Sequence, residues 1–163
     1  MYNSYIMNNS KIRVYLDNCC FNRPFDNQTS LVINMESIAK LYIQSKILVG
    51  DYDFVWSDIL EFENSNNPFE ERNKRIIKWK KIAVVKVEST NEVIENAKKY
   101  MELGIKPKDA LHISSSVFGK ADYFLTTDNG IIKKSQKIKD VKIMNPIDFV
   151  KEMEENNEDG RID

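Results

Sequence analysis

Short apolar segments alternate with helical patterns along nearly the whole chain, and no other feature constrains the fold as much. Five segments are apolar and rich in β-branched or aromatic residues, which is typical of strands; they span 12–16, 54–56, 82–87, 123–125 and 141–144. Helical patterns fill the gaps, at 31–47, 58–64, 70–81, 91–103 and 107–118, and a last helix starts at Asn145-Pro146. Such alternation predicts right-handed βαβ crossovers. We therefore expect an α/β fold of three layers, α/β/α, around a central, mostly parallel sheet of four or five strands.

The composition is that of one ordinary globular domain. The chain has 163 residues, of which 42% are hydrophobic and 30% charged. No apolar stretch approaches the roughly 20 residues that span a bilayer, and the polar start has no signal-peptide core. We therefore expect a cytoplasmic protein without membrane contact. Its polar ends, 1–10 and 155–163, are expected to be disordered tails around a domain of residues 11–154.

Cysteine, histidine and charge exclude several classes of protein. Cys19 and Cys20 are adjacent, so they cannot easily bridge each other and form no C-x-x-C pair; we expect reduced thiols. With His112 as the single histidine, a zinc site built from His and Cys is nearly excluded. A net charge of −1 argues against a pure nucleic-acid binder. It does not argue against a metallonuclease, because a bound metal supplies positive charge where the phosphate lies.

Acidic residues follow two of the predicted strands directly. In parallel sheets the active site lies beyond the carboxyl ends of the strands, where the strand order reverses. Asp17 follows the strand at 12–16, and Asp128 follows the strand at 123–125 after two threonines. Both carboxylates are therefore expected at the same edge of the sheet.

Two further acids lie on helices that start at this edge. Glu63 follows Ser57 by nearly two helical turns, so a helix starting at Ser57 turns Glu63 toward the edge and Glu61 away from it. Asp109 lies in the first turn of the helix that Pro107 opens, where the missing N–H of proline costs nothing. The sequence therefore predicts that Asp17, Glu63, Asp109 and Asp128 converge.

Each acid also has a purely structural interpretation. Asp17 could make an Asx turn, Asp109 could complement a helix dipole, and Asp128 could start the turn at Asn129-Gly130. Their joint placement favours a metal site, because clustered like charges raise one another's pKa unless a cation neutralises them. Hard divalent cations with oxygen ligands, Mg²⁺ or Mn²⁺, suit such a cluster.

Four segments together resemble the motifs of PIN domains in order and spacing: Val14-Tyr15-Leu16-Asp17, Ser57-x5-Glu63, Lys108-Asp109-Ala110-Leu111-His112 and Asp122-Tyr123-Phe124-Leu125-Thr126-Thr127-Asp128. The resemblance covers about residues 11–151. It implies a metal-dependent endoribonuclease whose catalytic and metal-binding residues are Asp17, Glu63, Asp109 and Asp128, with Mg²⁺ or Mn²⁺ as cofactor. PIN domains of this size include VapC-type toxins, so it also implies an RNA substrate, a protein antitoxin as partner and a homodimer. DNA remains an open alternative as substrate.

Other residues are expected around the acids. The resemblance makes Thr127 a hydroxyl neighbour of the metal-binding set. Asn18 directly follows Asp17, and His112 lies one helical turn after Asp109, so both could touch the site without binding the metal. A hydrogen-bonded helix histidine is the alternative role for His112, and we favour a structural role for Glu36. The basic residues that flank the motifs are candidates for phosphate contacts, although solvated surface charge is the alternative: Arg23, Lys106, Lys108, Lys133 and Lys134.

Three other functions compete with a nuclease. A receiver domain needs paired acids after its first strand, whereas Asn18 follows Asp17 and the pair Lys106-Pro107 follows a helix. A Mg²⁺ phosphatase with an Asp-x-Asp motif is excluded because position 19 is Cys. A PIN-like module that binds RNA or protein without cutting remains the alternative. The expected chemistry is metal-assisted hydrolysis of a phosphodiester by water, without a covalent intermediate.

Overall fold

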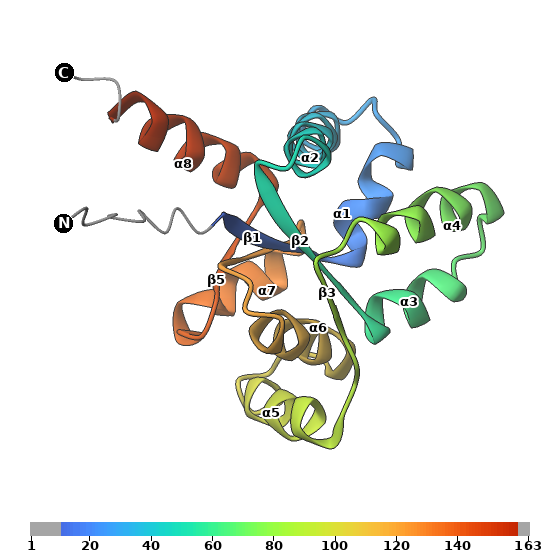
Figure 1. Cartoon of the computed structure of the whole chain (residues 1–163), viewed down its shortest axis with the longest axis vertical. Helices are drawn as coiled ribbons and strands as arrows, with labels where there is room; N and C mark the ends of the chain where they lie inside the picture. The colour runs from blue at the N-terminus through green and yellow to red at the C-terminus, as the bar shows by residue number, and fades with distance from the viewer. Residues whose placement is uncertain (1–10, 160–163) are drawn as a thin grey trace, which may run out of the picture.

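The structure is a computed structural model and describes residues 11–159. Its centre is a sheet of five parallel strands in the order β3-β2-β1-β4-β5 (Figure 1). The strands are β1 (Ile12–Leu16), β2 (Tyr52–Ser57), β3 (Val85–Val87), β4 (Tyr123–Leu125) and β5 (Lys142–Met144). The expected α/β fold with a central parallel sheet is confirmed.

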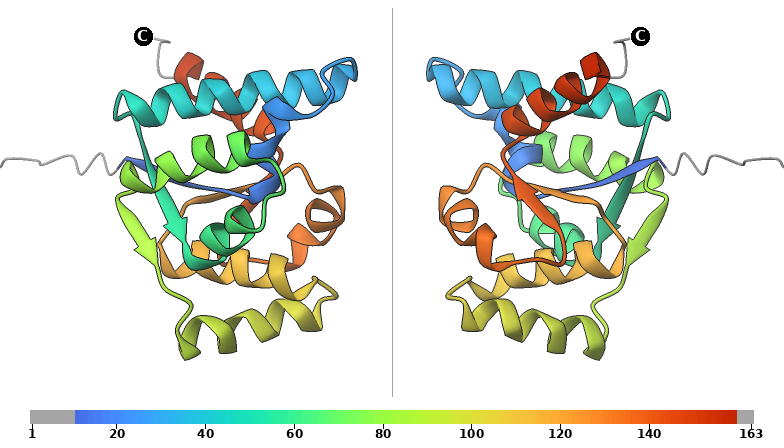
Figure 2. Two further views of the ribbon diagram at one scale, coloured as in Figure 1. Left: turned by 90° about the vertical axis from the view of Figure 1, so that its right-hand side faces the viewer. Right: turned by 90° about the vertical axis from the view of Figure 1, so that its left-hand side faces the viewer.

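Helices cover both faces of this sheet. They are α1 (Asn18–Asn22), α2 (Leu31–Leu48), α3 (Asp58–Ser65), α4 (Glu70–Ile77), α5 (Asn91–Glu102), α6 (Pro107–Phe118), α7 (Asn129–Lys134) and α8 (Pro146–Asp159). Helices α2 and α8 pack together on one side, and the pair α5–α6 covers the other (Figure 2). Local signals set their starts: Thr90 caps α5 by accepting from the Val93 N–H, and Pro107 is the first residue of α6. No helix within 11–159 is both long and apolar enough to cross a membrane.

The chain reverses its direction across the sheet at β1. It moves outward through β2 to β3, then returns to the other side of β1 to form β4 and β5. Leu16 of β1 pairs with Leu125 of β4, and the next N–H, that of Asp17, donates to the Leu125 carbonyl at 2.9 Å. The carboxyl ends of β1 and β4 thus lie side by side at the switch point, which is where doubly wound sheets bind ligands.

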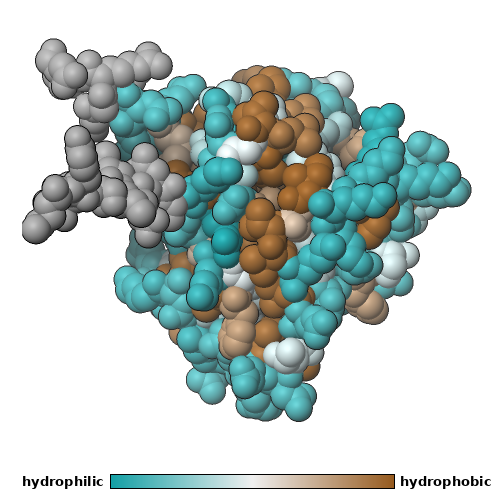
Figure 3. Space-filling view, in the orientation of Figure 1, coloured by the Kyte–Doolittle hydropathy of each residue, from teal (hydrophilic) through white to brown (hydrophobic). Residues whose placement is uncertain are grey.

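Large aromatic side chains fill the core. Phe21, Phe54 and Trp56 meet edge to face on one side of β2, and Tyr15 stacks on Phe124 with ring centroids 5.3 Å apart. At the surface, hydrophobic residues form a band between hydrophilic margins, over the part of the molecule where Figure 1 places β2 and β3 (Figure 3). Both cysteines are free thiols, as expected.

Several boundaries differ from the expected ones. The helix expected at 70–81 ends at Ile77 and continues as a 3₁₀ turn over Lys78–Lys81. The strand expected at 82–87 is only Val85–Val87, because Ile82 still closes that turn and β3 pairs with β2 alone. Helix α8 runs to Asp159, five residues into the expected tail, because its buried residues Phe149 and Met153 hold it against the core. The other expected tail, 1–10, lies outside the described residues.

Candidate active site

Asp17 is held rigidly at the end of β1. The residue is only 5% exposed. One carboxylate oxygen, Oδ1, accepts the Asn18 N–H at 2.8 Å, so Asp17 is also the N-cap of α1. The other oxygen, Oδ2, accepts the Thr126 hydroxyl at 2.9 Å and lies 3.4 Å from the Cys19 Sγ. Both oxygens are thus oriented by protein donors at the junction of β1 and β4.

Glu63 points from α3 toward this junction, as the sequence predicted. Its Oε2 accepts from the Asn18 side-chain amide at 3.2 Å, and its Oε1 accepts from Nε2 of His112. Glu61 instead forms an ion pair with Lys80 at 2.9 Å, away from the cluster. Burial alone would raise the pKa of Glu63, but the hydrogen bond and charge of His112, together with Lys108, lower it below its ordinary value. Glu63 is therefore a carboxylate at neutral pH.

His112 is completely buried and bridges three elements. Its Nε2 lies 3.8 Å from Asp17 Oδ1 in addition to its bond with Glu63. Its Nδ1 is 2.6 Å from the Tyr15 hydroxyl, which in turn is 2.7 Å from the Ser57 hydroxyl. Because a carboxylate only accepts, Nε2 carries a hydrogen. Burial would lower the pKa of His112, but Glu63 and Asp17 raise it above its ordinary value.

Asp109 carries the clearest electrostatic signal of the site. It lies in the first turn of α6 and is partly exposed. Its pKa is raised to about 6, first by burial and then by the charges of Asp17 and Asp128. The nearby His112 opposes this rise only partly. The charges of the other acids therefore act on Asp109, and the protein does not fully neutralise the repulsion among these carboxylates.

Asp128 lies at the outer edge of the cluster. It is exposed, and its Oδ1 accepts the Gly130 N–H at 2.8 Å and the Ile131 N–H at 3.4 Å, which makes it the N-cap of α7. Together with Asp109 and Lys106 it lines a cavity of about 120 Å³. Asp128 thus has the structural role of starting a turn, as one interpretation of the sequence proposed. Its charge still acts on the acidic site, because it raises the pKa of Asp109.

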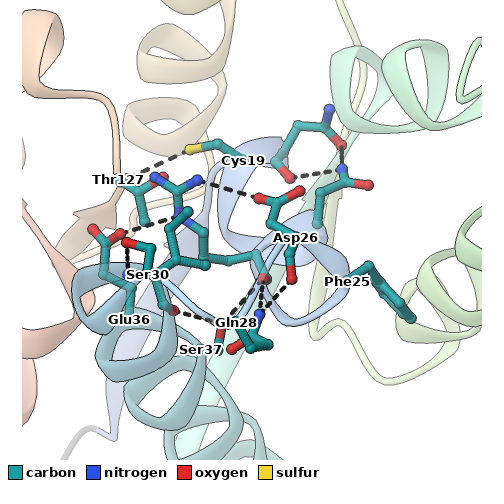
Figure 4. Close-up of polar contacts among 12 residues, drawn as sticks. Cys19, Phe25, Asp26, Gln28, Ser30, Glu36, Ser37 and Thr127 are labelled. Atoms are coloured by element: carbon teal, nitrogen blue, oxygen red, sulfur yellow. Dashed lines mark hydrogen bonds and ion pairs between the residues drawn. The ribbon is translucent and has the colours of Figure 1, made fainter.

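Among the expected basic residues, Arg23 differs from the two lysines at the start of α6. Arg23 is an exception to the prediction, because its guanidinium forms ion pairs with Glu36 at 3.1 Å and with Asp26 at 3.2 Å (Figure 4). These pairs fasten the loop after α1 onto α2, so Arg23 has a structural role, and so does the buried Glu36. Lys106 and Lys108 remain exposed at the start of α6, next to the acids.

The hydroxyl beside Asp17 comes from Thr126, not from Thr127 as the resemblance implied. The Thr127 backbone N–H instead faces the Cys19 sulfur at 3.4 Å (Figure 4). Tyr15, whose hydroxyl lies 2.6 Å from Nδ1 of His112 and orients its ring, was not among the predicted site residues. A tyrosine in a fully buried strand needs a hydrogen-bond partner for its hydroxyl, and this requirement could have indicated that Tyr15 contacts a polar residue of the site.

The donor chemistry of the site fits a hard divalent cation, since its acids offer carboxylate oxygens that repel one another. The spacing fits less closely. Between residues 11 and 159 no three Asp, Glu, His or Cys side chains are gathered tightly enough to hold a metal ion. The reason lies in the contacts above: Glu63 is turned onto His112, and Asp128 onto the start of α7. A metal would therefore require side-chain rotation at these positions.

Comparison with known proteins supports the fold. No family model and no curated protein sequence matches the chain. Among solved structures, it is similar to a chain in the crystal structure of VapBC2 from Rickettsia felis bound to a DNA fragment from their promoter. The TM-score is 0.52 at 14% identity, and the match covers 82% of this chain and 98% of that chain. A likeness at this identity shows a shared three-layer α/β/α, PIN-like fold and does not by itself show an activity.

Proposed function

We propose that this PIN-like domain is a nuclease that uses Mg²⁺ or Mn²⁺ to hydrolyse phosphodiester bonds in RNA. The observation that carries the proposal is the gathering of acids at the β1–β4 switch point, expressed in the pKa of about 6 of Asp109. Asp17, Glu63, Asp109 and Asp128 would hold the cation. The likeness to VapBC2 supports a nuclease fold and is consistent with this site.

A bound cation would neutralise charge on the phosphate and lower the pKa of a water molecule. The protein residues provide orientation. Asn18 and Thr126 fix the carboxylate of Asp17, and His112 and Asn18 hold Glu63 close to it. A side-chain rotation of Glu63 away from His112 would let both carboxylates hold one cation. Since Glu63 is ionised at neutral pH, it can also accept a hydrogen bond from the attacking water.

Two exposed lysines would bind the phosphates on either side of the cut. Lys106 lies on the side of Asp109 and Asp128, and Lys108 lies on the side of Glu63. Each supplies an exposed cation at the start of α6, outside the acidic cluster. Arg23 is not part of this set, because Asp26 and Glu36 already neutralise it.

The test is cleavage of single-stranded RNA by purified protein in Mn²⁺. We expect cleavage that EDTA stops, and losses of at least 100-fold in Asp17→Asn and Glu63→Gln. Glu61→Gln is the matched control on the same helix, because Glu61 pairs with Lys80 and should leave the rate within about twofold. Equal rates in Glu63→Gln and Glu61→Gln would refute the proposed site. Absence of metal-dependent cleavage of RNA and DNA would favour a non-catalytic binding module.

We also propose a protein antitoxin as partner, because the motifs of the chain resemble those of PIN domains, which include VapC-type toxins. If the chain is the toxin of such a pair, its expression in a bacterial host should stop growth, and Asp17→Asn should restore growth. If a neighbouring reading frame encodes a small protein, its co-expression should restore growth with wild-type Asp17. Growth arrest that persists in Asp17→Asn would contradict a toxic nuclease activity.

A further inference from the structure

A polar cavity of about 340 Å³ opens beside Glu63, separate from the small cavity between Asp109 and Asp128. Its size lies at the lower end of the roughly 300–1,000 Å³ that is usual for ligand pockets. It is lined from α1, α3, the α3–α4 connection, α4 and the start of α6, by Asn18, Asn22, Glu63, Asn66, Asn67, Pro68, Phe69, Arg72 and Lys108. Since Glu63 belongs to both the acidic site and this wall, a ligand here would extend directly into the acidic site.

Exposed aromatic rings with cations over them mark this region. Phe69 is 54% exposed, and the guanidinium carbon of Arg72 lies 4.2 Å from its ring centroid. Phe62 is 53% exposed, with the Lys108 ammonium 5.7 Å from its ring centroid. Arg72 is held in place by the Phe25 carbonyl at 2.8 Å and by an ion pair with Asp26. A fixed guanidinium, an exposed ring and an exposed lysine are the elements on which a base can stack and a phosphate can bind.

The side-chain amides of several asparagines provide hydrogen-bonding groups along the same cavity. The Asn67 side-chain amide donates to the Asn22 side-chain oxygen at 3.1 Å, the Asn22 amide donates to the Asn18 backbone carbonyl at 3.1 Å, and the Asn18 amide donates to Glu63. This chain of hydrogen bonds runs from the cavity to the acidic site. An amide has two donor hydrogens and two acceptor lone pairs, so each asparagine keeps capacity for a ligand. Amides of this kind pair with the edges of nucleobases.

From these observations we propose that the cavity is a nucleotide subsite that binds one unpaired base of the RNA strand next to the scissile phosphate. The inference rests on the proposed nuclease function and specifies its substrate as single-stranded. The base stacks against Phe69 and Arg72, Asn66 and Asn67 contact its edge, and Lys108 binds an adjacent phosphate. A paired base cannot enter, because its faces and its Watson–Crick edge are already occupied within the duplex.

The test measures binding without cleavage. Fluorescence anisotropy in EDTA, with labelled ten-nucleotide single strands of RNA and a duplex of equal length, separates binding from metal-dependent chemistry. We expect wild type to prefer the single strand. Phe69→Ala should weaken this binding roughly 5- to 150-fold, the equivalent of one base–aromatic stack. Phe69→Trp should retain it, since a larger ring also stacks.

Phe118→Ala is the matched control, because Phe118 is another exposed phenylalanine, 42% exposed, at the opposite end of α6 from Asp109. It should bind RNA like wild type. Lys108→Gln should reduce the salt dependence of binding by about one unit of slope. Asn66→Ala should reduce the ratio of affinities between the best and worst homopolymers. Should Phe69→Ala unfold, Phe69→Leu retains the apolar bulk without the ring, and it should bind as weakly.

Two outcomes would overturn the subsite: unchanged RNA binding in both Phe69→Ala and Phe69→Leu, or an equal loss in Phe118→Ala. A cavity that binds a protein partner instead would give the first of these. The proposed nuclease function fails separately. If wild type cleaves RNA in Mn²⁺ while Phe69 variants bind and cleave normally, only the subsite is wrong. If Phe69 variants lose binding while wild type cleaves nothing, the subsite stands and the nuclease is wrong.

Discussion

The carboxylate of Glu63 accepts a hydrogen bond from Nε2 of His112, although the two residues lie 49 positions apart in the sequence. This contact joins α3 to α6. The opposite ring nitrogen of His112 meets the Tyr15 hydroxyl and so reaches β1. Because His112 is fully buried, water cannot replace a missing partner. The orientation of Glu63 at the acidic site therefore depends on a network within the core.

Breaking this network should destabilise the protein strongly. His112→Ala leaves Tyr15 and Glu63 without their partner and removes a buried ring, so we expect a loss of about 3 kcal/mol in the free energy of unfolding. Tyr15→Phe removes one hydroxyl and should cost about 1–2 kcal/mol. Urea unfolding in EDTA measures both changes. A loss under about 0.5 kcal/mol in His112→Ala would mean that the network contributes little.

Asp109→Asn should stabilise the metal-free protein at neutral pH. The pKa of Asp109 is raised to about 6 in the folded state, so the folded state binds this proton more tightly than the unfolded state does. The stabilising contribution is therefore fully present below pH 4 and is lost as the pH rises from about 4 to 6. Allowing for solvent screening at a partly exposed group, the variant should gain about 1 kcal/mol at pH 7.5 and nothing at pH 4.

Asp148→Asn is the matched control for this measurement. Asp148 occupies the first turn of α8, as Asp109 occupies the first turn of α6, but it is not part of the acidic site. Its replacement removes a favourable interaction with the helix dipole, so it should lower stability by a few tenths of a kcal/mol at pH 7.5. If Asp109→Asn behaves like Asp148→Asn, then repulsion among the acids is negligible.

Lys40→Met should stabilise the protein at pH 7. Lys40 is only 5% exposed and, among residues 11–159, forms no ion pair, so burial lowers its pKa to about 8. The folded state thus binds this proton less tightly than the unfolded state, and wild-type stability rises between pH 8 and 10.5. Met retains the apolar stem, and the gain should be about 2–3 kcal/mol at pH 7.

The same difference should fall to roughly half at pH 9.5, where Lys40 is neutral in the folded protein. Urea unfolding at the two pH values measures it. Lys46→Met on the same helix serves as control, because Lys46 is more exposed and pairs with Asp51 at 3.4 Å. It should give no gain at either pH. A gain in Lys40→Met that does not change with pH would indicate a packing effect rather than a buried charge.

Gly119→Ala should destabilise the fold by overpacking. Gly119 ends α6, and a Cβ atom there would lie 2.6 Å from Val55 Cγ1 and 3.1 Å from Val87 Cγ2. Its backbone is right-handed, so alanine adds no conformational strain and the effect isolates the clash. We expect a loss of about 1–3 kcal/mol by thermal unfolding. Adding Val55→Ala should recover part of it, and purely additive losses would contradict the clash.

Much of the fold follows from local patterns. Segments 12–16 and 123–125 became β1 and β4 with the expected boundaries, because a short apolar run between polar residues can be buried on both faces of a parallel sheet. The orientation of Glu63 was also predictable. Once Ser57 starts the helix, as its hydroxyl accepts the Leu60 N–H at 3.2 Å, helical geometry decides between Glu61 and Glu63.

Contacts between distant segments were not predictable in the same way. Thr126 and Thr127 are adjacent and chemically identical, and only the pairing of β1 with β4 decides which hydroxyl meets Asp17. Likewise, the sequence predicted a phosphate contact for Arg23, but the packing of the α1–α2 loop places Glu36 against its guanidinium. The contact of Thr126 with Asp17 joins residues far apart in the sequence, and the contact of Arg23 with Glu36 spans an irregular loop. Neither contact leaves a local pattern in the sequence.

The sequence by itself determined the order of strands and helices, the parallel sheet and the positions of Asp17, Glu63, Asp109 and Asp128 near the carboxyl edge of that sheet. It could do so because periodicity and caps act over a few residues. The tertiary structure alone decided which of these carboxylates are oriented by Thr126, Asn18 and His112, and that a cavity with Phe69 and Arg72 lies beside them. The physical reason is that hydrogen bonds and burial depend on side chains brought together by packing, and no local pattern records them.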